Sequence, residues 1–234
     1  MSEQHSKHVR DLIKIFIANK NHATASSMKA YMRHQFEFLG IPSPKRSDLQ
    51  REFVSTACQA EDPIVYAEEL WRLPFREYQY TACDLLVKVA RTAKFLKRVE
   101  VSDRTVRRLE HLIITKSWWD TVDAIVPRIL FAVINQLPKG QLQKYANSLI
   151  EQENFWLQRS ALILQLGAKG NTDFELLSAL ILRRANSKEF FVQKASGWAL
   201  REYSKVNPRA VRKFINAYKE QLSRVTLREA EKYC

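Results

Sequence analysis

Hydrophobic residues recur at intervals of three and four along most of the chain. In the first such stretch, Val9, Leu12, Ile13, Phe16 and Ile17 fall on one face of a helix. This is the period of an amphipathic helix with one buried side. Alternating apolar and polar runs bounded by Asn-Gly or Asp-Gly turns, which are typical of β-hairpins, do not occur. The pattern therefore predicts an all-α protein.

The same periodicity predicts where the helices lie. The second helix is expected over 26–38, with Gly40 as its stop and Pro42 and Pro44 beyond it. Further helices are expected over 46–59, 63–72, 75–91, 103–114, 118–134, 139–151, 155–167, 173–185, 189–204 and 208–219. Because no segment is rich enough in Gly, Ser or Pro to act as a linker, we expect a single domain over 1–234.

Four segments of the chain are similar to one another. When Tyr80, Asp123, Arg159 and Lys194 are taken as equivalent, the segments follow at intervals of 43, 36 and 35 residues. Helix-pair solenoids such as HEAT and armadillo repeats have a period of roughly 40 residues. One pair cannot bury its apolar stripe alone, so neighbouring pairs must stack. The sequence predicts an α-solenoid of HEAT-like helix pairs with one concave face, along which the four equivalent residues line up.

The chain is strongly basic. Its 38 Lys and Arg residues exceed its 25 Asp and Glu residues by 13, and its pI is near 9.7. Residues 88–108 hold eight basic and two acidic side chains, and residues 201–232 hold nine and four. Either cluster alone is compatible with a solvated helix face. Clustering on several repeats predicts a basic concave face that binds nucleic acid, with an acidic protein surface as the rival partner.

Other features restrict the class of protein. The longest apolar run near the middle, 129–134, is far shorter than the roughly 18 residues of a membrane span. The N-terminus is polar and lacks a secretory hydrophobic region, so we expect a cytoplasmic protein. Cys58, Cys83 and Cys234 have no short spacing, and the histidines form no ligand pair beyond the two at the N-terminus. We therefore expect neither a disulfide framework nor a metal site.

The most unusual segment runs from Ser117 to Asp123. Ser117 is expected to cap a helix, in a capping box with Asp120. Trp119 and Asp123 then lie one turn apart on one face, whereas Trp118 turns inward. Spacing alone leaves open that both tryptophans are core residues and that Asp123 caps a helix or pairs with a lysine. Arg159 and Trp198 could likewise be a surface ion pair and a packing residue.

The sequence resembles a known family in four places: residues 31–41 (YMRHQFEFLGI), 114–127 (ITKSWWDTVDAIVP), 154–161 (NFWLQRSA) and 187–203 (SKEFFVQKASGWALREY). These segments look like the DNA alkylation repair family, the bacterial alkylpurine DNA glycosylases with HEAT-like repeats. The resemblance implies a monofunctional glycosylase that removes N3- and N7-alkylated purines from duplex DNA. It further implies that no metal or cofactor takes part and that the lesion stays stacked.

The resemblance also implies roles for individual residues. Trp119, Asp123 and Trp198 correspond to the catalytic residues, Arg159 to a residue that holds the DNA backbone, and Tyr31 to a further DNA contact. Lys194, in the next repeat, is expected to bind DNA too. Compared with that family, the C-terminus looks short.

The predicted chemistry follows from the substrate. N3 or N7 alkylation makes the purine cationic and therefore a good leaving group, so the enzyme has only to stabilise an oxocarbenium-like sugar and to guide a water molecule. A carboxylate suits both tasks, and we expect Asp123 to be exposed on the basic face and kept ionised by its neighbours. The alternatives are a non-catalytic DNA-binding paralogue and a protein-interaction scaffold. We expect a monomer in each case.

Overall fold

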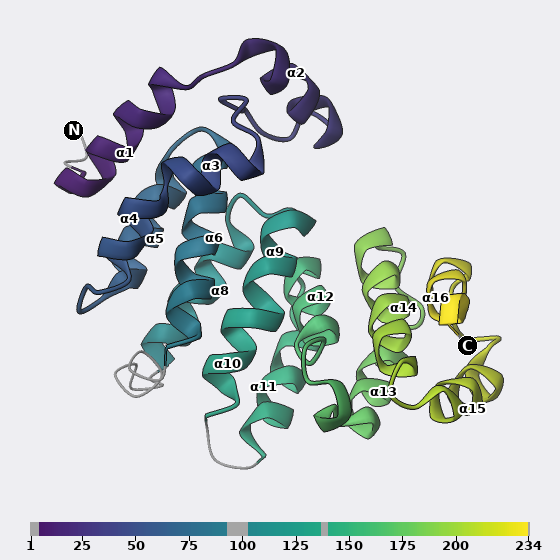
Figure 1. Ribbon diagram of the computed structural model, residues 1–234. Coiled ribbons are helices and arrows are strands. Elements are labelled where there is room, and N and C mark those ends of the chain that lie inside the picture. Colours follow the sequence, from purple (N-terminus) through teal and green to yellow (C-terminus); the bar gives the residue numbers. More distant parts are fainter. Residues whose placement is uncertain (1–4, 93–102, 137–139, 234) are drawn as a thin grey trace. The chain divides into compact units, whose positions relative to one another are not determined.

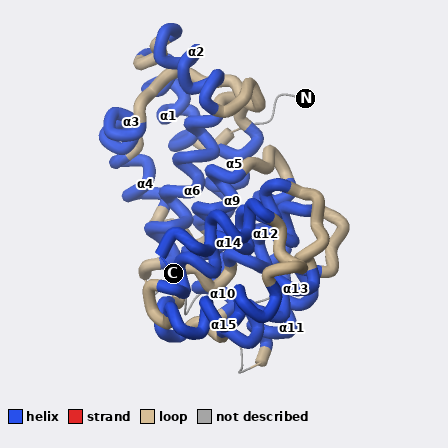
Figure 2. Tube along the Cα trace, turned by 90° about the vertical axis from the view of Figure 1, so that its right-hand side faces the viewer, coloured by secondary structure: helices blue, strands red, loops and turns tan. Residues whose placement is uncertain are grey.

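The computed structural model describes residues 5–92, 103–136 and 140–233 (Figure 1). The described residues are helical and contain no strand, apart from one isolated bridge between Glu37 and Phe75 (Figure 2). The all-α prediction is confirmed. The chain divides into two compact units, residues 1–95 and 96–234, so the single domain stays a prediction. Lys94, Lys97 and Arg98 of the first basic cluster lie outside the described residues.

The N-terminal unit is built from short helices. They are α1 (Lys7–Ala18), α2 (His22–Tyr31), α3 (Ser43–Leu49), α4 (Arg51–Ala57), α5 (Pro63–Arg72) and α6 (Arg76–Ala90). Of the apolar face predicted for α1, Val9, Leu12 and Phe16 are buried, whereas Ile17 is exposed. Phe16 stacks on Tyr78 of α6 with ring centroids 5.5 Å apart. Helices α5 and α6 pack closely on each other as a pair.

The helix predicted over 26–38 is wrong in extent, because α2 ends at Tyr31. Arg33 and His34 have φ angles of 52° and 58°, in the left-handed region that stops a helix. The apolar residues that follow, from Phe38 to Ile41, are buried as a non-helical segment. Burying this segment requires a partner for its backbone, so tertiary structure overrides the helical pattern here.

The partner of that segment is Glu77 of α6, which is itself fully buried. Its carboxylate accepts hydrogen bonds from the backbone N–H groups of Leu39, Gly40 and Ile41 at 3.0, 2.8 and 3.1 Å. Gly40 has φ +85°, and a Cβ there would lie 2.0 Å from the carbonyl oxygen of Asn21. Gly40 is therefore required for two reasons: its backbone adopts a left-handed turn, and it lies too close to the backbone of Asn21 to leave room for a side chain.

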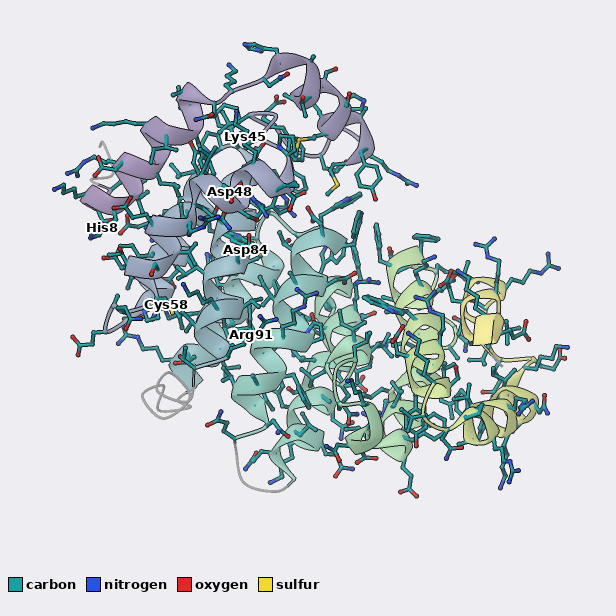
Figure 3. All side chains as sticks on the ribbon, in the orientation of Figure 1. His8, Lys45, Asp48, Cys58, Asp84 and Arg91 are labelled. Carbon is teal, nitrogen blue, oxygen red and sulfur yellow. The ribbon has the colours of Figure 1, made fainter. Side chains whose placement is uncertain are left out.

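The helix predicted over 46–59 begins earlier and is divided at Gln50 into α3 and α4. Gln50 is buried, donates to Asp84 on α6 at 2.7 Å and accepts from Thr81. Arg46 donates to the same Asp84 oxygen at 3.0 Å; Figure 3 labels Asp84 on α6. These side-chain bonds tie α3 to α6.

The C-terminal unit continues with paired helices. They are α8 (Asp103–Ile114), α9 (Trp119–Ile125), η1 (Val126–Leu130), α10 (Phe131–Ile134), α11 (Gln141–Ile150), α12 (Phe155–Ile163), η2 (Lys169–Asn171), α13 (Phe174–Arg183), α14 (Phe190–Ser204), α15 (Pro208–Tyr218), α16 (Arg224–Ala230) and η3 (Glu231–Tyr233). Helix α12 packs on α11 and α14, and α14 packs on α15 and α16. This stacking of successive helices agrees with the predicted repeat of helix pairs.

Three features of this unit differ from the sequence prediction. The helix expected over 118–134 contains a π-helical turn, Val126–Leu130, with Pro127 at its start. Proline lacks the N–H of a regular helical hydrogen bond, and a wider turn accommodates this loss. The helix expected over 155–167 is also wrong in extent, because α12 ends at Ile163. Helix α16 was not predicted at all.

Across the described ranges, no helix combines the length and the hydropathy that a membrane span requires.

Candidate active site

The turn between α8 and α9 sets the directions of the two adjacent tryptophans. Ser117 was expected to cap α9, but Trp118 occupies the N-cap position, and the Ser117 hydroxyl donates to the carbonyl of Ile113 at 2.7 Å. The capping-box prediction is therefore wrong. The reason is the backbone at Lys116, whose φ of 49° turns the chain sharply after α8, so that Ser117 closes the end of α8.

Trp118 packs inward, as predicted. Its ring lies 6.0 Å from that of Trp156 on α12 and 5.1 Å from that of Phe191 on α14. Trp156 and Phe191 are in turn 4.9 Å apart. Three successive repeats thus share one aromatic cluster, which fixes the first turns of α9, α12 and α14 against one another. Such ring pairs contribute about 0.5–1.5 kcal/mol each beyond their buried area.

Asp123, on α9, forms a bidentate ion pair with Arg159 on α12. The Nε and Nη2 atoms of Arg159 donate to Oδ1 and Oδ2 of Asp123 at 2.9 and 2.8 Å. The arginine side chain is 3% exposed and the aspartate side chain 17%. The expectation of an exposed Asp123 is therefore wrong, because the carboxylate is drawn onto a buried guanidinium. The carboxylate nevertheless remains the more accessible partner of the pair.

Arg159 is held on its other side by α14. Its Nη1 donates to the carbonyl of Phe191 at 2.6 Å. Its guanidinium carbon lies 6.0 Å from the Phe191 ring and 5.9 Å from the Trp198 ring. Arg159 therefore joins α9, α12 and α14 and fixes the orientation of the carboxylate. Its predicted contact with the DNA backbone stays a prediction.

Opposing effects act on the pKa of Asp123. Burial raises this pKa above its ordinary value, the charge and hydrogen bonds of Arg159 oppose that rise, and the nearby Asp120 adds to it. Burial is the largest of these effects, so the pKa is raised. Arg159 therefore favours the ionised form of Asp123 against the effect of burial.

Trp119 and Trp198 are both half-buried. Trp119 is the first residue of α9, one turn before Asp123, and Trp198 lies on α14 beside Arg159. The structure thus brings Asp123, Arg159 and Trp198 into one site and places Trp119 on the same helix as the carboxylate. Their catalytic roles stay predictions.

Lys194 lies on the same face of α14 as Phe191 and Trp198, since the three residues are spaced i, i+3 and i+7. Its ammonium group pairs at 2.7 Å with Glu229, a residue of α16 that the sequence analysis did not select. Glu229 would have been found by continuing the repeat, because it follows Lys194 by 35 residues.

The remaining candidate, Tyr31, belongs to the N-terminal unit. It is the last residue of α2, and its side chain is 73% exposed. Its predicted DNA contact stays a prediction. Within 5–92, 103–136 and 140–233, no group of three or more His, Cys, Asp and Glu side chains is arranged to hold a metal ion.

Comparison with known protein families shows the class of protein to which the chain belongs. Residues 12–234 match the family model of the DNA alkylation repair enzymes. The chain belongs to this family, and membership supports a role in the repair of alkylated DNA.

A solved structure gives a more particular relative. The "predicted DNA alkylation repair enzyme from Enterococcus faecalis" is 35% identical to this chain, with a TM-score of 0.79. The alignment covers 92% of this chain and 96% of that one. No curated protein matches the chain.

Proposed function

We propose that this protein is a monofunctional DNA glycosylase that hydrolyses the N-glycosidic bond of N3- and N7-alkylated purines in duplex DNA. The observation that carries the proposal is the Asp123 carboxylate, oriented by Arg159 and accompanied by the half-buried Trp119 and Trp198. Family membership supports alkylated DNA as the substrate.

In the proposed reaction, the bond between C1′ and the purine nitrogen breaks, and its electron pair goes to the cationic base. The base leaves as a neutral alkylpurine, and C1′ becomes oxocarbenium-like. Asp123 lies beside this cation and orients a water molecule, whose oxygen bonds to C1′. One proton of that water passes to the carboxylate and then to solvent, which leaves an abasic site. No metal or organic cofactor is required.

Electrostatic attraction is the main contribution in this proposal. A carboxylate about 4 Å from a developing cation contributes roughly 4 kcal/mol at an effective dielectric of about 20, or about a thousandfold in rate. The positive charge of Arg159 reduces this electrostatic stabilisation. The Arg159 side chain is only 3% exposed, however, so the carboxylate and not the guanidinium is the accessible side of the pair. The indole rings of Trp119 and Trp198 add about 0.5–2 kcal/mol through cation–π attraction.

We further propose that the alkylated base stays stacked in the duplex while the protein contacts the sugar and the backbone. Most glycosylases instead enclose a flipped base in a pocket. Because no pocket has to enclose the adduct here, bulky lesions should be accepted. Activity that collapses once the adduct exceeds a methyl group would contradict this part of the proposal.

The test is direct. The wild-type protein and Asp123→Asn are incubated with methylated duplex DNA, and the released bases are separated and identified. We expect 3-methyladenine and 7-methylguanine from the wild type. Release by the variant should fall by about two to three orders of magnitude, while duplex affinity stays equal or rises, because one repelling charge is lost.

Three results would contradict the proposal. Equal release by both proteins would remove Asp123 from the mechanism. No release by a wild type that binds duplex DNA would favour a non-catalytic DNA-binding paralogue, and no salt-dependent binding would favour a protein-interaction scaffold.

A further inference from the structure

The ion pair between Asp123 on α9 and Arg159 on α12 has a counterpart later in the chain, the ion pair between Lys194 on α14 and Glu229 on α16. Asp123 and Arg159 are 36 residues apart, and Lys194 and Glu229 are 35 apart. Since these intervals equal one repeat, the four residues occupy the same repeat position on α9, α12, α14 and α16. The order of charges along this row is acid, base, base, acid.

Glu229 binds more than one cation. Its Oε1 accepts from the ammonium groups of Lys194 at 2.7 Å and Lys232 at 2.8 Å, and its Oε2 accepts from Arg201 at 2.7 Å. Glu202 and Lys205 extend the group through Arg201 without changing its net charge. Three cations thus surround one carboxylate.

Burial makes this group positive toward solvent. Glu229 is 3% exposed, whereas the side chains of Lys194 and Lys232 are 38% and 48% exposed. Because both ammonium groups bind the same carboxylate oxygen, their nitrogens are at most about 5.5 Å apart. Two partly exposed lysine side chains whose ammonium groups lie this close together can contact the oxygens of one phosphate.

Close packing holds the group next to the candidate active site. A Cβ on Gly197 would lie 2.5 Å from Cβ of Glu229 and from the carbonyl oxygen of Thr226, so α16 crosses α14 in direct contact with its backbone. Thr226 also donates to the carbonyl of Gln193 at 3.0 Å. Figure 1 shows α14 and α16 side by side. Gly197 immediately precedes Trp198, so α16 fixes the helix that carries this indole.

We infer that Lys194 and Lys232 form a binding site for a backbone phosphate of duplex DNA, with Glu229 as the residue that positions both ammonium groups. This inference rests on the proposed function for its partner. It extends the DNA contacts from α14 to η3, which carries Lys232. Since Glu229 is buried beneath the ammonium groups, its charge weakens binding even as it fixes the geometry.

The experiment is a salt titration of binding to a fluorescent, undamaged duplex. It compares the wild type with Lys194→Ala, Lys232→Ala and Glu229→Gln, and with Lys213→Ala as a matched control at an exposed lysine of α15. Each of the two lysine variants should lower the slope of log Kd against log salt by about one. The control should keep the wild-type slope. Glu229→Gln, which keeps its shape, should bind about fivefold more tightly at low salt, because one repelling charge is removed.

Glu229→Gln keeps the shape of the side chain and removes its charge, so a complex that is not tighter than that of the wild type would mean that this charge does not lie near the DNA, and would overturn the inference. Wild-type slopes for Lys194→Ala and Lys232→Ala would overturn it as well. If Glu229→Gln fails to fold, Lys232→Ala still tests the inference. The Lys232 side chain is half exposed, and its removal leaves Glu229 with two cationic partners, so we expect this variant to fold. Base release is measured separately on methylated DNA: a protein that shows the predicted slopes but releases no base contradicts the proposed function and not this inference.

Discussion

Arg159 offers the sharpest test of how the site keeps its carboxylate ionised. Arg159→Ala removes two charge-assisted hydrogen bonds, at 2.9 and 2.8 Å, from a carboxylate that is 17% exposed. Arg159→Lys keeps the charge but cannot form the same planar, bidentate pair. The two variants therefore separate the effect of charge from the effect of geometry on Asp123.

The expected magnitude follows from these contacts. An opposite charge within about 4–6 Å lowers the pKa of a carboxyl group by roughly 1–3 units. Burial already raises the pKa of Asp123 and Arg159 opposes it, so Arg159→Ala should raise this pKa further by a similar amount. If ionised Asp123 stabilises the sugar cation, the acid limb of the excision rate should move to higher pH by about 1–3 units. Arg159→Lys should show a smaller movement.

The assay is single-turnover release of 7-methylguanine from duplex DNA between pH 4.5 and 9, corrected for spontaneous depurination. Arg183→Ala serves as the control, because Arg183 is an exposed arginine on α13 that pairs with Glu151. If Arg159→Ala lowers the rate equally at every pH, Arg159 does not act through Asp123. A lower salt slope for that variant would then indicate the backbone contact predicted from the sequence.

Three further predictions concern stability and substrate range. Gly197→Ala should lower the free energy of unfolding by about 1–3 kcal/mol, because the added methyl group overpacks against Glu229 and Thr226, and should lower the Tm by several degrees. Gly170→Ala is the control, because the space around its Cβ is open. Equal Tm values for the two variants would contradict the close contact at Gly197. Burial raises the pKa of Glu229, but the hydrogen bonds and charges of Lys194 and Lys232 outweigh burial and bring it to about 2 from 4.5. A lowered pKa stabilises the fold above pH 4.5, and this contribution disappears as the pH falls towards 2. The free energy of unfolding of the wild type and of Glu229→Gln is measured by chemical denaturation at pH 6 and at pH 2.5. The difference between the two proteins should be about 1–2 kcal/mol larger at pH 6, after allowance for screening. An equal difference at both pH values would exclude a contribution from the ionisation of Glu229. In a series of N7 adducts of increasing size, excision should persist beyond methyl, and loss at ethyl would argue for an enclosing pocket.

The class of fold and the residues worth examining follow from the order of the amino acids alone. Apolar spacing of three and four residues specifies helices wherever one face is buried, and the repeat interval of 35 to 43 residues relates Asp123, Arg159 and Lys194 before any contact is known. The same interval, extended once more, reaches Glu229. The last repeat is hard to identify from its sequence, because residues 223–232 lack the aromatic residues that mark the other repeats.

The contacts that these side chains make depend on how the helices pack in three dimensions. Periodicity cannot show that residues 38–41 leave the helix to meet the buried Glu77, because that bond joins positions almost forty residues apart. Nor can periodicity show that Asp123 pairs with Arg159 instead of facing solvent. The two residues are far apart in the sequence, and only the packing of their helices buries both charges at the same place. The pattern of burial is local in the sequence, whereas the pairing of buried charges depends on how the helices stack.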